Sequence, residues 1–244
     1  MKVAAIVQAR MGSTRLPGKV LLDLAGRSVL ARVVERLRRA GLVDEILVAT
    51  TDSSPDDRIV EECGRHSVAV FRGQEDDVLD RYYRAAKSIA AEVVVRITSD
   101  CPLIDPEVTD ETIRRFLAQR PDFASNCRLI RKYPRGLDTE VMTARALEQA
   151  WREADQDYQR VHVTPYIYEN PAKFKLLSVA ADQDYSRHRW TIDTQEDLDL
   201  ARAIYDRLGA NGDFLWRDVL ALVERNPELA ELNRRVIQKS LREG

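Results

Sequence analysis

The chain has 244 residues, of which 44% are hydrophobic and 32% are charged, and 38 Lys and Arg against 40 Asp and Glu give a net charge of −2. The hydrophobic fraction argues against disorder. The lack of a basic excess argues against a general nucleic-acid binder. Apolar runs stay well below the roughly 18 residues of a membrane span, and the run after Lys2 is too short for a signal-peptide core. We therefore expect a globular protein that contacts neither nucleic acid nor membrane.

The three cysteines are widely spaced and form neither a disulfide framework nor a CxxC metal site. This usage indicates a reducing, cytoplasmic compartment. The length fits one or two domains at about 150 residues each. A single α/β domain with one elaboration fits best.

Short apolar runs alternate with helical periodicity over the first ~120 residues. Ser28 is an expected helix cap, and Gly41 the expected end of that helix. The pattern predicts strands at residues 3–7, 45–50, 67–71 and 93–97, and helices at 28–39, from 54, at 77–91 and from 105. Such alternation is typical of βαβ units and a parallel sheet with helices on both faces.

After Pro121 the alternation is lost. Residues 134–140 indicate a loop, and a helix is expected at 143–154. Strands are expected at 174–180 and 189–192. Thr194 then caps a helix with Asp197 three residues on, and the last ~30 residues are expected to be mainly helical. Without repeats or a clear linker, the region 123–185 is best treated as an elaboration inside one domain.

The loop at residues 8–19 is the most informative stretch. It follows the first expected strand, at the carboxyl edge where open α/β sheets bind ligands. Its cations are Arg10, Arg15 and Lys19, and its glycines are Gly12 and Gly18. Cations together with free backbone N–H groups suit a polyphosphate. The spacing matches neither a P-loop nor a GxGxxG fingerprint, and a solvated surface loop is the alternative.

Two aspartates are expected at the same edge of the sheet. Asp100 follows the strand at 93–97, and Asp193 follows the strand at 189–192. One or two carboxylates together with phosphate oxygens and water commonly hold Mg²⁺. Each aspartate also has a plainer interpretation, Asp100 as a turn residue and Asp193 as a residue at a helix start.

The segment Ala9-Arg10-x-x-Ser13-Thr14-Arg15-Leu16-Pro17-Gly18-Lys19 closely resembles the N-terminal motif of the sugar-acid cytidylyltransferases. This family includes the CMP-KDO (3-deoxy-manno-octulosonate) and CMP-acylneuraminate synthetases, and the opening residues 7–10 are most similar to its SpsF-type spore-coat polysaccharide branch. The resemblance continues in order through residues 98–105, 134–140, 162–165 and 189–198.

The resemblance implies a nucleotide-diphospho-sugar transferase-like fold with three α/β/α layers, a mostly parallel central sheet and a small inserted dimerisation and acceptor region. It also implies CTP as donor, Mg²⁺ as cofactor and a homodimer. We expect one domain over 1–244. Within it, residues 1–122 form the nucleotide-binding half, 123–185 the acceptor and dimerisation elaboration, and 186–244 the metal-site strand and C-terminal helices.

The resemblance, with the reasoning above, assigns the candidate site residues. Catalysis is expected from Arg15, Lys19 and Asp100, and metal binding from Asp100 and Asp193. Nucleotide binding is expected from Gln8, Ala9, Arg10, Met11, Gly12, Ser13, Lys19 and Ser99. Acceptor binding is expected from Arg135, Asp138, Glu140, His162 and Arg189. The related pattern often has an acid immediately before the histidine, where this chain has Val161.

These assignments predict a Mg²⁺-dependent transfer of CMP from CTP to a sugar acid or related acceptor, with release of pyrophosphate, in the synthesis of activated sugars for surface polysaccharide. Arg15 and Lys19 would hold the β- and γ-phosphates. One alternative is a metal-dependent glycosyltransferase that uses Asp182-Gln183-Asp184. The others are a cytidylyltransferase acting on a non-sugar acid or phosphonate, and a nucleotide sensor without turnover.

Overall fold

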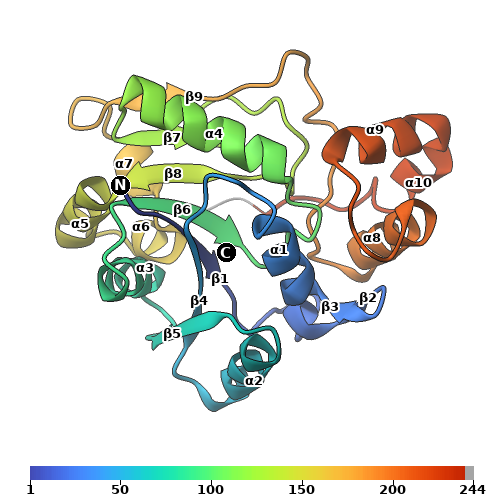
Figure 1. The fold of residues 1–244 in the computed structure, drawn as a ribbon, viewed down its shortest axis with the longest axis horizontal. Helices are drawn as coiled ribbons and strands as arrows, with labels where there is room; N and C mark the ends of the chain where they lie inside the picture. The colour runs from blue at the N-terminus through green and yellow to red at the C-terminus, as the bar shows by residue number, and fades with distance from the viewer. Residues whose placement is uncertain (240–244) are drawn as a thin grey trace.

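A computed structural model describes residues 1–239, so the end of the expected 186–244 region, residues 240–244, lies outside the described residues. The core of the fold is a seven-stranded sheet in the order β5-β4-β1-β6-β8-β7-β9 (Figure 1). A separate antiparallel hairpin joins β2 (Asp23–Leu24) and β3 (Arg27–Ser28). The sheet strands are β1 (Val3–Gln8), β4 (Glu45–Thr51), β5 (Ala69–Gly73), β6 (Val93–Thr98), β7 (Phe123–Ser125), β8 (Glu140–Thr143) and β9 (Leu176–Ser178).

Ten α-helices and two short 3₁₀ turns lie within residues 1–239. The 3₁₀ turns are η1 (Lys19–Leu21) and η2 (Ser54–Asp56). The α-helices are α1 (Val29–Leu37), α2 (Asp57–Arg65), α3 (Val78–Ser88), α4 (Pro106–Gln119), α5 (Ala144–Glu153), α6 (Asp157–His162), α7 (Pro165–Tyr168), α8 (Gln195–Leu208), α9 (Trp216–Arg225) and α10 (Pro227–Glu231).

Alternation along β1 shows how the three layers form. Val3, Ala5 and Val7 are buried in one core cluster with α1, α2 and α4. Ala4 and Ile6 are buried in another with α3, α5 and α7. Successive side chains of a strand point to opposite faces, so a strand buried on both faces is apolar throughout. The expected three-layer α/β/α fold with a mostly parallel sheet is confirmed.

The parallel strands place their carboxyl ends at one edge of the sheet. Gln8, the last residue of β1, pairs with Ala49 of β4 and with Thr98, the last residue of β6. The loop after β1 and the loop after β6 therefore start side by side. This register brings residues 9–19 and 99–105 together.

Some of the expected boundaries in the first half were wrong. The Ser28 side chain does cap α1, because its Oγ accepts a hydrogen bond from Ala31 N at 3.0 Å. That helix, however, ends at Leu37 with Arg38 in a right-handed conformation, so Gly41 does not close it. The helix expected from residue 54 begins as the 3₁₀ turn η2, and α2 follows at Asp57.

The second half departs further from expectation. Glu140 was expected in a loop but begins β8, which runs antiparallel between β6 and β7. The expected strand at 189–192 was wrong, because only Arg189 makes an isolated bridge, to Arg135. The helix after Thr194 is confirmed as α8, with the Thr194–Asp197 capping box in place. Of the helices in residues 1–239, none has the length and apolar character needed to cross a membrane.

Candidate active site

The loop after β1 folds back on itself. Gly18 N donates a hydrogen bond to Met11 O at 3.1 Å, and Leu16 N donates to Ser13 Oγ at 3.3 Å. Gly18 closes the turn at a φ of 67°, in the left-handed region that glycine adopts without strain. The chain then enters η1 at Lys19. This closed loop holds the backbone from which Arg15 and Lys19 reach the site.

Lys19 joins the two predicted aspartates. Its Nζ lies 2.6 Å from Asp100 Oδ2 and 2.8 Å from Asp193 Oδ1, and it donates a third hydrogen bond to Ile192 O at 2.8 Å. Arg15 Nη2 lies 3.0 Å from Asp193 Oδ2. The structure thus brings all four predicted catalytic and metal-binding residues together, although 174 positions separate Lys19 from Asp193.

The charges of this cluster stabilise one another. Burial by itself lowers the pKa of Lys19, but the carboxylates of Asp100 and Asp193 outweigh burial and leave that pKa raised. Burial by itself raises the pKa of Asp193, but Lys19, Arg189 and Arg15 outweigh it and lower that pKa to about 2. Lys19 therefore stays charged and Asp193 ionised across the neutral pH range.

Asp193 is held by loop-to-loop contacts and not by a strand. Ile192 N donates a hydrogen bond to Asp100 O at 2.8 Å, and Trp190 N donates to Arg135 O at 2.7 Å. Gly136, at a φ of 106°, lets residues 190–191 pass so close that an added Cβ would lie 2.6 Å from the Trp190 carbonyl carbon. The segment at 189–192 thus places Asp193 beside Asp100 as expected, but through loop contacts and not as the strand that its apolar pattern predicted.

The donor set at this point is one that a hard cation accepts. Asp100 and Asp193 each present one carboxylate oxygen to the same position, which the Lys19 ammonium occupies. Within residues 1–239, no group of three or more Asp, Glu, His or Cys side chains is arranged for a metal. Two carboxylates fit a Mg²⁺ ion that takes its other ligands from phosphate oxygens and water, so the residues present fit the expected ion.

The predicted nucleotide-binding residues line the same loop but differ in their contacts. Gln8 Oε1 accepts a hydrogen bond from Arg96 Nη2 at 2.9 Å, and Gln8 O accepts one from Ser99 N at 3.1 Å. Ala9 N donates to Ala49 O, which extends the pairing with β4. The structure therefore places Gln8, Ala9 and Ser99 beside one another at the start of the site.

Arg10 and Met11 contact residues 56 and 75 and not the aspartate cluster. Met11 N donates a hydrogen bond to Asp56 Oδ1 at 2.7 Å. Arg10 lies 3.5 Å from Glu75 in a pair that is about half exposed, and Glu75 Oε1 would lie 3.4 Å from a Cβ added at Gly12. Arg10 is thus not joined to the aspartate cluster. Its predicted nucleotide contact remains a prediction.

Asp56 is a residue that the sequence analysis missed. Its carboxylate is 2% exposed and also accepts hydrogen bonds from the hydroxyls of Thr50 and Thr51. In the sequence it stands at an apparent helix start, and nothing in that pattern indicates that it reaches the β1 loop. Through Met11 it ties the loop to the carboxyl end of β4.

Glu140, predicted to bind the acceptor, lies in a buried ion-pair network. Its carboxylate is 2.7 Å from Arg96 Nη1 and 3.0 Å from Arg128 Nε, and it accepts a hydrogen bond from Thr164 Oγ1 at 2.5 Å. Burial by itself raises its pKa, but Arg128 and Arg96 outweigh burial and lower it. Arg96 was not among the predicted site residues, although a charge inside the apolar run of β6 is a usable signal.

Two other predicted acceptor residues, Asp138 and Arg135, differ in their pairing. Asp138 accepts a bidentate pair of hydrogen bonds from Arg131 at 2.6 and 2.8 Å. Within residues 1–239, the half-buried Arg135 guanidinium makes no hydrogen bond or ion pair. Burial and the charge of Arg131 lower the pKa of Arg135. Arg135 is thus a partly desolvated cation whose nearby carboxylate, Asp138, raises its pKa less than burial and Arg131 lower it. Such a cation is unfavourable unless an anion binds there.

His162 and Thr164 flank a strained turn. His162 ends α6, and Thr164 N donates a hydrogen bond back to His162 O at 2.9 Å. Between them Val163 is fully buried at a φ of 72° and a ψ of −55°, a γ-turn that is rare for a β-branched residue. This turn directs Thr164 onto Glu140. His162 itself is half-buried, and its predicted acceptor contact remains a prediction.

Arg189, also predicted to bind the acceptor, instead belongs to the aspartate cluster. Its Nη2 lies 2.6 Å from Asp193 Oδ2, and its Nε lies 2.9 Å from Asp197 Oδ1. Burial by itself lowers its pKa, but Asp197 and Asp193 outweigh burial and raise it. Its charge is therefore neutralised by protein carboxylates, in contrast to that of Arg135.

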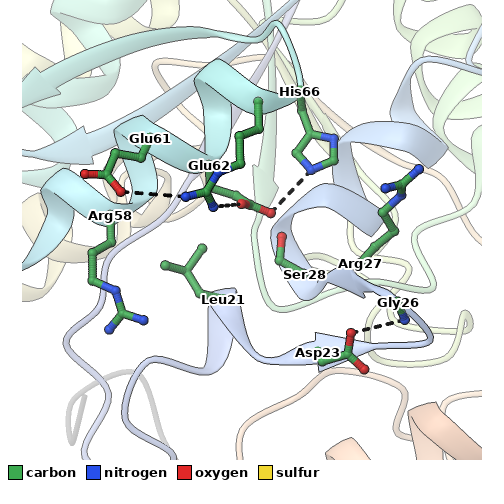
Figure 2. Close-up of a pocket in the computed structure, with 10 residues that line it drawn as sticks. Leu21, Asp23, Gly26, Arg27, Ser28, Arg58, Glu61, Glu62 and His66 are labelled. Atoms are coloured by element: carbon green, nitrogen blue, oxygen red, sulfur yellow. Dashed lines mark hydrogen bonds and ion pairs between the residues drawn. The ribbon is translucent and has the colours of Figure 1, made fainter.

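Neither the alternative metal motif nor a surface cavity beside α2 includes the residues of the aspartate cluster. Asp182 and Asp184 are exposed and accept hydrogen bonds from the nearby backbone N–H groups of Gln183 and Ser186. A cavity of about 390 Å³ lies between the β2–β3 hairpin and α2 (Figure 2). Among its charged groups, Glu62 pairs with Arg65 and His66, and the cavity contains none of the predicted site residues.

Comparison with known proteins supports the same assignment. A family model described as cytidylyltransferase matches residues 4–225. This chain belongs to the cytidylyltransferase family. The cytidylyltransferase is 35% identical over 232 residues to the spore coat polysaccharide biosynthesis protein SpsF of Bacillus subtilis, an alignment that covers 92% of this chain and 95% of SpsF. The family expected from the loop motif is therefore confirmed.

Solved structures agree on the fold of this cytidylyltransferase. A cytidylyltransferase from Leptospira borgpetersenii superposes with a TM-score of 0.91 at 35% identity, over 98% of this chain and 100% of that one. A CMP:2-keto-3-deoxy-manno-octonic acid synthetase complexed with CTP superposes with a TM-score of 0.67 at 20% identity, over 85% of this chain and 100% of that one. The second likeness bears on the fold alone.

Proposed function

We propose that this cytidylyltransferase transfers CMP from CTP to an acidic sugar or a related small acid and releases pyrophosphate. A hydroxyl or carboxyl oxygen of the acceptor attacks the α-phosphorus, a P–O bond to the acceptor forms, and the bond to the bridging oxygen of pyrophosphate breaks. The observation that carries the proposal is the convergence of Lys19, Asp100 and Asp193 beside the loop after β1. Two similar proteins support the substrate class: SpsF, a spore coat polysaccharide biosynthesis protein, and a CMP:2-keto-3-deoxy-manno-octonic acid synthetase complexed with CTP.

The side of the site formed by Lys19 and Arg15 is positively charged and therefore suits the phosphates of CTP. Lys19 and Arg15 supply two cations from one closed loop, and both contact Asp193. When a triphosphate binds, its β- and γ-phosphate oxygens compete with Asp193 for these cations. The cations then stabilise the negative charge that builds up on the departing pyrophosphate. Positioning and charge stabilisation suffice for this transfer, so no covalent enzyme intermediate is required.

Asp100 and Asp193 would hold Mg²⁺ between them. Such an ion, when bound, neutralises phosphate charge and orients the triphosphate. Because Lys19 Nζ lies between the two carboxylates, Lys19 would turn toward the phosphates as the ion is taken up. Lys19 would thus remain within reach of the leaving group.

Arg135 supports an acidic acceptor. Across residues 1–239 its guanidinium makes no direct ion pair, and the nearby Asp138 does not offset burial and Arg131, so that the pKa of Arg135 stays lowered. Its backbone is joined to residues 188–190 of the segment that carries Asp193. A carboxylate on the acceptor would provide the missing charge through a bidentate contact. Arg135 would thereby discriminate acids from neutral sugars.

We further propose a cytoplasmic homodimer assembled through the 123–185 region. Sedimentation analysis would test the dimer.

The direct test measures pyrophosphate release with CTP, Mg²⁺ and a panel of sugar acids and phosphonates. We expect turnover with at least one acid, and a loss of about 100- to 1000-fold in the Asp100→Ala variant, by analogy with removal of one preorganised electrostatic group. Asp182→Ala, an exposed aspartate, serves as the matched control and should leave turnover unchanged. Turnover that survives Asp100→Ala, or consumption of a nucleotide sugar without pyrophosphate release, would overturn the proposal.

A further inference from the structure

The chain returns to the site after its last helix. Asn233 lies just beyond α10 and is 5% exposed. Its Nδ2 donates hydrogen bonds to Arg189 O at 2.9 Å and to Asp197 Oδ1 at 2.8 Å. Five residues later, the exposed Gln238 accepts a hydrogen bond from Arg189 Nη1 at 2.6 Å. Both contacts lie beyond residue 225, where the match to the family model ends.

Arg189 transmits these contacts to Asp193. Each of its three guanidinium nitrogens is engaged, Nη1 by Gln238, Nε by Asp197, and Nη2 by both Asp193 and Asp197. The Arg189 side chain is 11% exposed, so it has little room to adopt another rotamer. Its bond to Asp193 Oδ2 leaves Oδ1 of that carboxylate facing Lys19.

Asp197 holds the same aspartate through the backbone. Its Oδ2 accepts hydrogen bonds from Asp193 N at 2.9 Å and Thr194 N at 3.2 Å, while its Oδ1 accepts those of Arg189 and Asn233. The Asp197 side chain is fully buried, and an unpaired carboxylate there is costly. Asn233 thus completes the set of donors around Asp197.

We propose that Asn233 and Gln238 are positioning residues, which fix the Asp193 carboxylate for Mg²⁺ and CTP through Arg189 and Asp197. This inference rests on the proposed function, in which Asp193 is a metal ligand. Groups that hold a ligand side chain in its rotamer tune metal affinity, and their removal typically weakens it about 10- to 100-fold. The C-terminal segment is therefore part of the site and not only a covering of α8.

The test is calorimetric titration of CTP, without acceptor, in Mg²⁺ and separately in EDTA. For Asn233→Ala we expect the gain in CTP affinity brought by Mg²⁺ to fall about 10-fold, with the affinity in EDTA unchanged. Gln238→Ala should lower the same gain by a smaller factor, and because Gln238 is exposed this variant should fold normally. Arg234→Ala is the matched control, since Arg234 is 74% exposed and pairs only with Glu231 within residues 1–239.

The outcomes separate the two proposals. If Mg²⁺ raises the CTP affinity of the wild type and raises that of both variants by the same factor, the positioning role alone is overturned. Affinity that falls equally in Mg²⁺ and in EDTA also overturns it, because a general structural defect would act in both conditions. A wild type that binds CTP without any Mg²⁺ gain overturns the metal role of Asp193 in the proposed function, and this inference with it.

Discussion

The lowered pKa of Asp193 predicts how much this side chain contributes to folding stability and at which pH. Asp193→Asn removes the charge and keeps the shape of the side chain. The pKa of Asp193 is about 2 in the folded chain against an ordinary 3.8. A difference of nearly two pKa units corresponds to about 2.5 kcal/mol of unfolding free energy at neutral pH, which the variant should lack.

The sign of the pH dependence follows from the direction of the shift. Because the folded-state pKa is depressed, the contribution is fully present above about pH 4 and is lost as the pH falls toward 2. The difference between wild type and variant should therefore shrink to about half its neutral value near pH 3. Below that pH, protonation of Asp193 removes the stabilisation that its carboxylate gains from Lys19, Arg189 and Arg15.

Urea unfolding of both proteins at a series of pH values between 7 and 3 measures this difference. Asp199→Asn is the matched control, because Asp199 is 50% exposed on the neighbouring turn of α8 and should give no measurable change. A loss below about 0.5 kcal/mol at pH 7, or a loss of equal size at pH 7 and pH 3, would show that Lys19, Arg15 and Arg189 do not stabilise the Asp193 carboxylate as described.

Three more variants test other parts of the site. Lys19→Met should lower pyrophosphate release about 100- to 1000-fold, and a smaller effect in a steady-state assay would remove Lys19 from the phosphate-binding role. Gly136→Ala should reduce the unfolding free energy by about 1–3 kcal/mol. Gly64→Ala, with no atom within 4 Å of the added Cβ, should leave it unchanged. Equal melting temperatures of the two variants would contradict the close approach of Trp190 to Gly136. Glu140→Gln should reduce stability in urea by about 3–5 kcal/mol, because it leaves Arg96 and Arg128 without their buried carboxylate; an unchanged midpoint would argue against that network.

Local sequence signals predicted correctly that the loops after β1 and β6 lie at one edge of the sheet. The apolar run of β1, buried on both faces, indicated a central parallel strand, and the register of such strands brings the loops after β1 and β6 together. The juxtaposition of Lys19 and Asp100 follows from this register. The Thr194–Asp197 capping box likewise marked the start of α8 correctly, because capping depends only on neighbouring residues.

Features that depend on distant partners were not predictable. Glu140 was a poor candidate for a buried strand residue until Arg96, 44 positions away, and Arg128, 12 positions away, were seen to neutralise it. The run at 189–192 has the apolar pattern of a strand, yet Trp190 and Ile192 are buried in the cluster around α8 and α9, without a sheet. In both cases burial and hydrogen bonding are supplied by other segments of the chain, which the local sequence does not reveal.

The separation of the site residues along the chain has a consequence for folding while the protein is being synthesised. Lys19 meets Asp100 across 81 positions and Asp193 across 174, and Asn233 joins the cluster only after α10 has formed. Such non-local contacts form late in folding because a large loop must close first. A nascent chain still lacking its final segment carries the cations of the first loop without their full set of carboxylates, so competence to bind the nucleotide should arise only near the end of synthesis.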